Sequence, residues 1–203
     1  MDGAAHVTQA RTGPHESRRR RKGFGGMRIG RKLLFILVLC AWLKCSVAQD
    51  GKALAATPAG GFQFVGSWNC SGAFGSGETH RSTFTAGVIL DGKWLELTEK
   101  DIEPATGYLA KYLIGYNAQQ KRLVEFDANN FGAATYASAE GWKDGVLTMT
   151  SDVSSDPHAP YAANRFLYSV AAKDSFVVDW QVSKSQALNW VSGDHLVCIR
   201  ASH

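Results

Sequence analysis

Histidine side chains could define a chemical site in this sequence, and their spacing tests that idea first. Between residue 62 and the last residue, the histidines are His80, His158 and His195. None lies at a spacing from cysteine, aspartate or another histidine that is typical of a metal site. His80 stands at the start of an expected strand and His158 in a proline-flanked loop, so we expect both to be solvated at the surface. The sequence therefore predicts no metal.

Carboxylates gather along one segment of the chain. Glu96, Glu99, Asp101 and Glu103 occur within one expected strand and its turn, among leucine and isoleucine residues. We interpret this cluster as the wet outer face of that strand. The sequence contains no G-x-S-x-G motif, no Walker loop and no Cys–His pair. It therefore predicts no catalytic residue and no cofactor.

The four cysteines fall into two groups. Cys40 and Cys45 lie in or beside an apolar run near the N-terminus, whereas Cys70 and Cys198 lie near the two ends of the remaining chain. An even pair of cysteines in an exported chain indicates a disulfide. We therefore expect a bond between Cys70 and Cys198.

An export signal is indicated by residues 27–48. Residues 27–32 (MRIGRK) are basic, residues 33–43 form an apolar run, and residues 46–48 (SVA) offer small side chains to a signal peptidase. The apolar run is too short to cross a bilayer comfortably. We expect cleavage and a periplasmic or extracellular location, with no membrane attachment after cleavage; an uncleaved anchor is the alternative.

The flanking segments complete the expected domain organisation. Residues 1–26 precede the basic region with which a signal peptide begins, and we interpret them as an upstream extension. Residues 49–61 (QDGKALAATPAGG) are small and show no periodicity, which is typical of a linker. The folded domain is then expected over residues 62–203.

The net charge of +4 is unevenly distributed. Residues 1–48 contain ten Lys/Arg and two Asp/Glu, whereas residues 49–203 contain twelve and sixteen. The expected domain is therefore mildly acidic, and it carries no basic patch with interleaved aromatic residues. This distribution argues against a nucleic-acid partner.

The expected domain reads as a succession of β-hairpins. Alternation with a period of two is clearest over residues 175–184, where alternate residues from Phe176 to Val182 share one face. Asp91-Gly92 between two apolar runs is a strong hairpin signal. We expect an all-β fold, an antiparallel up-and-down meander of about ten strands. Closure into a barrel would remove the sheet edges; an open sandwich is the alternative.

The first and last expected strands carry two matched pairs of residues. Trp68 and Cys70 lie two apart on the first strand, and Cys198 and Arg200 lie two apart on the last. Residues two apart share a face of a strand. In a closed barrel with an even number of strands, one antiparallel register places Cys70 opposite Cys198 and Trp68 opposite Arg200. A disulfide and a guanidinium stacked on an indole ring are therefore predicted together.

At these residues the sequence resembles the calycins, the superfamily of the lipocalins and their relatives. The motif G-x-W-x-C at residues 66–70, with C-x-R at residues 198–200, is similar to bacterial exported calycin-like families of unknown function. The resemblance covers residues 62–201. It implies that Trp68 and Arg200 seal the closed end of a barrel, which is a structural role.

A more distant resemblance is to the haem-binding nitrobindin branch, in which a late histidine holds iron. His195 is late in this chain, but its parity is opposite to that of Cys198 and Arg200. We expect it to point outward unless a bulge at Gly193 shifts it. A haem-binding, nitrobindin-like protein is therefore an alternative function.

Aromatic side chains are the remaining candidates for a binding site. They either pack as a plain core or line a cavity for a small apolar or amphipathic ligand. The leading prediction is such a ligand-binding barrel. The alternatives are an enzyme acting on a hydrophobic small molecule in the cavity, and a structural or partner-binding domain with a filled core. The residues expected to line the cavity are Tyr112, Phe166, Tyr168, Phe176 and Trp180.

Overall fold

The computed structural model describes residues 53–202, and every helix or strand element in this range is a β-strand. No helix in the described range is long and apolar enough to cross a bilayer. The strands are β1 (Gly66–Phe74), β2 (Thr79–Ile89), β3 (Trp94–Glu103), β4 (Leu109–Asn117), β5 (Arg122–Asn129), β6 (Gly132–Ser138), β7 (Trp142–Lys143), β8 (Val146–Ser151), β9 (Ala163–Ala172), β10 (Ser175–Ser183) and β11 (Val191–Arg200).

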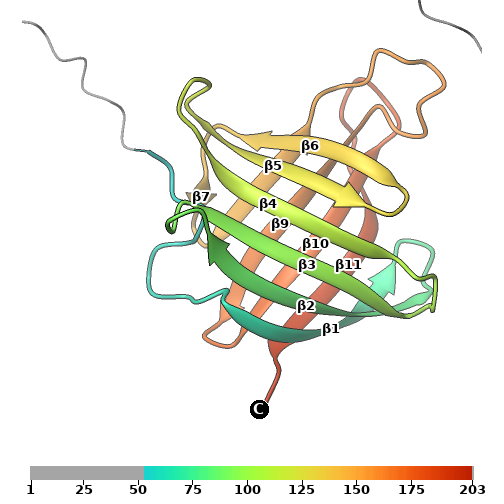
Figure 1. Cartoon of the computed structure of the whole chain (residues 1–203). Coiled ribbons are helices and arrows are strands. Elements are labelled where there is room, and N and C mark those ends of the chain that lie inside the picture. Colours follow the sequence, from blue (N-terminus) through green and yellow to red (C-terminus); the bar gives the residue numbers. More distant parts are fainter. Residues whose placement is uncertain (1–52, 203) are drawn as a thin grey trace, which may run out of the picture. The chain divides into compact units, whose positions relative to one another are not determined.

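Ten of these strands close into a barrel (Figure 1). Neighbouring strands are antiparallel and follow the chain from β1 to β6 and from β8 to β11. The ring closes where β1 pairs with β11 and where β6 pairs with β8. The two-residue strand β7 pairs with β8 and stands beside the ring. The predicted fold class, an antiparallel all-β meander closed into a barrel of about ten strands, is confirmed.

The hairpin between β2 and β3 shows how local sequence sets the meander. Leu90, Asp91 and Gly92 have φ angles of 51°, 56° and 81°. This left-handed conformation suits glycine and is tolerated by aspartate in tight turns. The Asp-Gly signal therefore marks the turn that it predicts.

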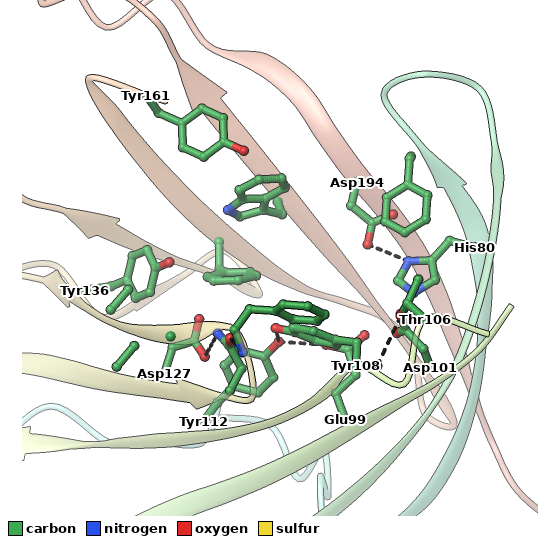
Figure 2. Close-up of a pocket in the computed structure, with 18 of the residues that line it drawn as sticks. His80, Glu99, Asp101, Thr106, Tyr108, Tyr112, Asp127, Tyr136, Tyr161 and Asp194 are labelled. Atoms are coloured by element: carbon green, nitrogen blue, oxygen red, sulfur yellow. Dashed lines mark hydrogen bonds and ion pairs between the residues drawn. The ribbon is translucent and has the colours of Figure 1, made fainter. Parts of the chain in front are cut away.

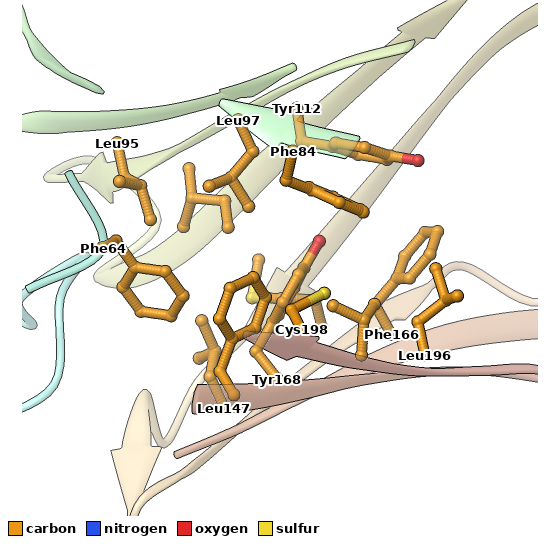
Figure 3. Packing of buried hydrophobic residues seen from close by; sticks show 14 of the residues in the cluster. Phe64, Phe84, Leu95, Leu97, Tyr112, Leu147, Phe166, Tyr168, Leu196 and Cys198 are labelled. Atoms are coloured by element: carbon orange, nitrogen blue, oxygen red, sulfur yellow. The ribbon is translucent and has the colours of Figure 1, made fainter. Parts of the chain in front are cut away.

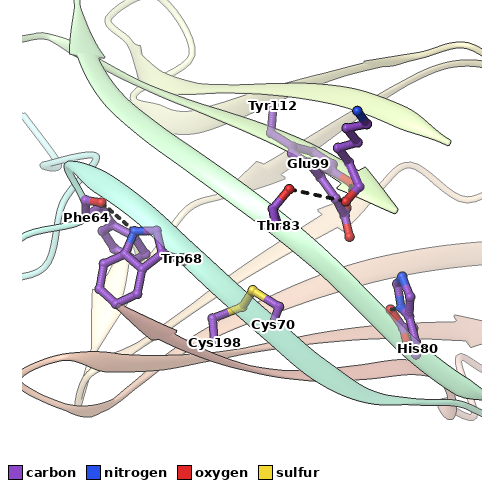
Figure 4. Close-up of a disulfide and its surroundings, with 10 residues drawn as sticks. Phe64, Trp68, Cys70, His80, Thr83, Glu99, Tyr112 and Cys198 are labelled. Atoms are coloured by element: carbon purple, nitrogen blue, oxygen red, sulfur yellow. Dashed lines mark hydrogen bonds and ion pairs between the residues drawn. A yellow bond between two sulfur atoms is a disulfide. The ribbon is translucent and has the colours of Figure 1, made fainter. Parts of the chain in front are cut away.

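The junction between β1 and β11 carries the disulfide (Figure 4). Cys70 lies opposite Cys198 and is bonded to it, as the cysteine pattern predicts. In the same register Trp68 lies opposite Arg200. The bond joins residues 128 apart in the sequence, so it restricts most of the chain in the unfolded state.

One end of the barrel is filled by aromatic side chains, and we call it the closed end. Phe62 and Phe64, from the segment that precedes β1, pack against Trp68 and Phe176 with ring centroids 5.1 to 6.4 Å apart. The Trp68 indole Nε1 donates a hydrogen bond to the Phe64 carbonyl oxygen at 2.8 Å. Figure 3 shows Phe64 among the leucine residues of this packed interior.

Arg200 covers the closed end from outside. Its guanidinium carbon lies 4.2 Å from the centroid of the Trp68 ring. Its nitrogens donate hydrogen bonds to the carbonyl oxygens of Val65 and Gln63. Gly66 has a φ of +132°, and a Cβ there would lie 2.8 Å from an Arg200 nitrogen. The glycine of the G-x-W motif is thus required by its own backbone and by the arginine.

The chain just before Phe62 also contacts the barrel. The side chain of Leu54 packs against the core, and the Trp142 indole Nε1 donates a hydrogen bond to the carbonyl oxygen of Ala56 at 3.0 Å. Part of the segment expected to be a linker is therefore docked beside β7.

The inward-facing rows of side chains change character along the barrel axis. On β3 the row begins with Leu95 and Leu97, which are fully buried, and continues with Glu99. On β2 it runs from Phe84 back to His80. The interior is thus apolar near the closed end and polar at the opposite end, which we call the open end.

Candidate functional site

A cavity of about 730 Å³ lies at the open end of the barrel (Figure 2). This volume is within the usual range for sites that bind small molecules. Its walls combine aromatic rings with acidic side chains. The aromatic residues that line it are Phe74, Tyr108, Tyr112, Phe131, Tyr136, Tyr161, Phe166 and Trp180.

Three of the five aromatic residues proposed from the sequence line this cavity, namely Tyr112, Phe166 and Trp180. Tyr168 and Phe176 do not, and their assignment to the cavity wall is corrected. Phe176, near the start of β10, packs at the closed end, and Tyr168 lies in the buried core, because both are farther along the barrel axis from the opening.

Trp180 depends on a neighbouring glycine for its place in the wall. A Cβ at Gly193 would lie 2.4 Å from the Trp180 ring. The pairing of β10 with β11 shifts register next to Trp180, and this irregularity is at the glycine where a bulge was considered. The glycine thus leaves room for the indole beside the cavity.

His80 is buried, and the expectation that it is a surface residue is wrong. Only 4% of the residue is exposed. Its Nδ1 lies 2.8 Å from an Asp194 oxygen and its Nε2 lies 3.0 Å from an Asp101 oxygen. Two carboxylates as acceptors require a proton on each ring nitrogen, so the ring is held as a cation. Burial alone would lower the pKa of His80, but the hydrogen bonds to Asp194 and Asp101 raise it to about 9.

Glu99 is also buried, which corrects its interpretation as part of a wet outer face. Its exposed fraction is 5%, and it faces the cavity. The error was one of parity: Glu99 has the same parity as Leu95 and Leu97 and therefore shares their inward face. The same reasoning, applied backward from Phe84, places His80 inside the barrel. Both residues could have been found from the alternation alone.

A hydrogen-bonded chain of side chains connects Glu99 to two tyrosines. The Tyr112 hydroxyl donates to a Glu99 oxygen at 2.7 Å. The Tyr108 hydroxyl lies 3.2 Å from the Tyr112 hydroxyl and is placed to donate to it. Burial raises the pKa of Glu99 to about 7, although the hydrogen bond from Tyr112 acts in the opposite direction. Glu99 is thus poised to exchange a proton near neutral pH.

Asp127, on β5, is the carboxylate on the opposite side of the cavity from His80 (Figure 2). Its exposed fraction is 6%. One of its oxygens accepts a hydrogen bond from the Asn129 amide nitrogen at 3.0 Å. Burial raises the pKa of Asp127 above its ordinary value, and this hydrogen bond partly offsets the effect.

A further buried carboxyl lies between the cavity and the closed end. Glu125 is fully buried, and one of its oxygens accepts a hydrogen bond from the Tyr168 hydroxyl at 3.0 Å. Its other oxygen has no partner among the described residues. Burial raises the pKa of Glu125 to about 8, and the hydrogen bond from Tyr168 lowers it in part.

Within residues 53–202, His80, Glu99 and Asp101 have ligand atoms close enough together for a metal ion, within 4.8 Å of one another. Both ring nitrogens of His80 are already hydrogen-bonded to carboxylates. The Thr106 hydroxyl also donates to Asp101 at 2.9 Å. The cluster satisfies itself without an ion, and we interpret it as a buried ion-pair network.

The other two histidines of the part of the chain that the structure describes, His158 and His195, do not line the cavity. His158 is exposed, as expected. His195 lies on the outer face, where its Nδ1 is 2.6 Å from an Asp179 oxygen. The histidine on which the haem-binding alternative depends therefore does not face the interior.

Fold and site together define a closed antiparallel β-barrel with an aromatic and acidic cavity at one end. This architecture is consistent with the calycin-like fold that the sequence resembles. No model of a known protein family matches the chain, and no curated protein matches it either. The function must therefore be argued from the site itself.

Proposed function

We propose that this chain is an exported β-barrel protein that binds a small amphipathic molecule in the cavity at its open end. The observation that carries the proposal is the cavity of about 730 Å³ with aromatic walls. Aromatic rings take up the apolar body of a ligand, and a few polar groups fix its orientation. A barrel with a wholly filled core, the structural alternative, offers no such space.

Two observations support export. The Cys70–Cys198 disulfide is typical of proteins that fold in an oxidising compartment. Residues 27–48 have the three-part pattern of a signal peptide and lie outside the described residues. Sequencing the N-terminus of the protein recovered from an exporting host tests this part, with a start shortly after residue 48 expected. A start within residues 1–26 would contradict it.

Filling the cavity tests ligand binding. Ala134 lies in the cavity wall, directly opposite Asp127 on the neighbouring strand. Ala134→Phe would occupy the space without removing any polar group. The matched control is Ala128→Phe, because Ala128 is exposed and stands next to Asp127 on the same strand.

Native mass spectrometry of the protein purified from an oxidising compartment gives the readout. We expect a retained small molecule on the native protein and on Ala128→Phe, and none on Ala134→Phe. Equal retention by all three proteins would place the ligand elsewhere. Bare protein in every case, even after incubation with a mixed lipid and metabolite extract, would favour a structural role.

A second candidate function is acid–base catalysis on the bound molecule. Glu99 lines the cavity, and burial raises its pKa to about 7, near the optimum for proton transfer at neutral pH. Incubating the retained molecule with native protein and with Glu99→Gln distinguishes the two functions. A product formed by the native protein and not by Glu99→Gln would indicate an enzyme. An unchanged molecule with both proteins would indicate binding alone.

A further inference from the structure

The ionisable side chains that line the cavity do not balance in charge. Its one basic residue, among the described residues that line it, is His80, and neither lysine nor arginine contributes to the wall. Aromatic surroundings screen charge poorly, so an excess of one sign acts strongly on a bound molecule. The acidic residues that line it are Glu99, Asp101, Asp127 and Asp194.

The positive charge of His80 is neutralised by the two aspartates beside it. Asp101 and Asp194 lie within 3.0 Å of its two ring nitrogens, so this group of three carries an excess of negative charge by itself. Within residues 53–202, neither Glu99 nor Asp127 forms an ion pair with a lysine or an arginine. Both carboxyls are more than nine-tenths buried and face the cavity. Each of these two carboxyls therefore lacks a cationic partner. A positively charged ligand could supply one.

The two carboxyls come from the strands on either side of β4, which carries Tyr112. The Tyr112 hydroxyl donates a hydrogen bond to a Glu99 oxygen, and Tyr112 lies opposite Asp127 in the pairing of β4 with β5. Burial raises the pKa of the neighbouring Tyr108 hydroxyl, and the negative charges of Asp127 and Glu99 both add to the effect. The electron-rich faces of such rings attract cations. Carboxylates and aromatic faces thus border one region of the cavity.

We propose that the ligand of this cavity is an organic cation, a small ammonium compound with an apolar body. The inference rests on the proposed ligand-binding function and specifies the chemistry of the ligand. The ammonium group binds beside Glu99 and Asp127, and the apolar body packs against the rings of Tyr136, Phe166 and Trp180. Because the cavity measures about 730 Å³, the apolar body is compact enough to fit between those rings.

Three probes with one apolar body and different head groups test the proposal. They are 3-phenylpropylammonium, 3-phenylpropanol and 3-phenylpropionate, and isothermal titration calorimetry on the native protein at pH 8 measures their affinities. We expect the ammonium probe to bind at least about tenfold more tightly than the alcohol, and the carboxylate to bind most weakly.

Variants that remove one negative charge test whether the preference for the ammonium probe depends on Glu99 and Asp127. Glu99→Gln and Asp127→Asn should each weaken ammonium binding about tenfold and change alcohol binding less than about twofold. Glu96→Gln is the matched control, because Glu96 lies on the same strand and forms a surface ion pair with Lys111 at 3.0 Å. It removes the same charge and should leave all three affinities unchanged.

The possible outcomes distinguish a failure of the cation proposal from a failure of the proposed ligand-binding function. Equal affinities for ammonium and alcohol, or tighter binding of the carboxylate, would overturn the cation inference and leave a ligand-binding barrel. An equal loss of ammonium affinity in Glu96→Gln would also overturn it, because the effect would then be one of net charge. If none of the probes binds at about 1 mM, the cation inference and the compact ligand pocket both fail.

Discussion

The two ends of the barrel are built from the same ten strands, yet one interior is filled with apolar side chains and the other contains charged ones. At the closed end, Phe64, Trp68 and Phe176 fill the space. The cation Arg200 lies outside, where it donates hydrogen bonds to two backbone carbonyl oxygens and to an Asp174 carboxylate oxygen. At the open end, buried carboxyls surround a cavity. Burying charge costs stability unless it is paired. The contrast therefore separates an end that holds the fold together from the end that we propose as the binding site.

The transition between the ends occurs along individual strands. The inward row of β5 passes from Leu123 through Glu125 to Asp127, and each residue is at least nine-tenths buried. A row that served stability alone would continue with apolar side chains. Departures from that pattern are expected at functional sites, and the variants below test whether stability and binding separate in the same way.

The largest expected effect is on the β1–β11 junction beside the closed end. Replacing both cysteines, Cys70→Ser with Cys198→Ser, should lower the free energy of unfolding by about 4–5 kcal/mol, because the bond closes a loop of 128 residues. Urea denaturation measures the loss, and reduction of the native protein should reproduce it. Ligand binding should persist below the unfolding transition. An unchanged midpoint would contradict this role of the disulfide.

At the open end the largest expected effect is on His80. His80→Leu leaves Asp101 and Asp194 facing each other without a cation, which should cost about 3 kcal/mol at pH 6. A raised pKa means that the stabilisation is complete below about pH 6.5 and is lost as the pH rises through about 9. The difference between His80→Leu and the native protein should therefore shrink towards pH 10.

Thermal unfolding between pH 6 and pH 10 measures that difference. His158→Leu is the control, because His158 is exposed, and it should match the native protein throughout. A constant difference between His80→Leu and the native protein across this range would contradict the buried ion pair. It would mean that the imidazole contributes by packing alone.

The sequence predicts the closed end much better than the open end. The pairing of Cys70 with Cys198 follows from type and parity, because a disulfide has one partner and a fixed geometry. For His80 and Glu99 the polar side chain predicts exposure, which is wrong, because the strand alternation turns both residues inward. Their partners come from distant strands: Asp194 lies 114 residues from His80. No local pattern reveals such an ion-pair network.

A smaller effect of opposite sign is expected between the two ends. Burial raises the pKa of Glu125 from 4.5 to about 8, so keeping this group in the fold costs nothing below pH 4.5 and increasingly more as the pH rises to 8. Glu125→Gln should therefore stabilise the barrel by about 2–3 kcal/mol at pH 6.5, about two pH units above the ordinary pKa, since one pKa unit corresponds to about 1.4 kcal/mol. Near pH 4.5 the two proteins should be equally stable.

Urea denaturation at the two pH values measures this crossover. Glu140→Gln, which removes a charge from an exposed position, should change neither value by more than about 0.5 kcal/mol. Destabilisation by Glu125→Gln at pH 6.5 would show that the ionised carboxylate is held by a favourable interaction. The polar residues in the inward row of β5 would then stabilise the fold. The contrast between a stabilising closed end and a binding open end would be weaker.

The smallest expected effect is at the closed end. Arg200→Lys keeps the charge but loses the flat stack on Trp68 and the paired hydrogen bonds to the carbonyl oxygens of Gln63 and Val65. Because the side chain is partly exposed, we expect a loss of about 1 kcal/mol and a melting temperature lower by about 2–4 °C. Arg81→Lys, at an exposed ion pair, is the control. Probe affinities at the open end should not change. A weakened affinity in Arg200→Lys would mean that the two ends are coupled through the barrel, and their separation into stability and binding would be wrong.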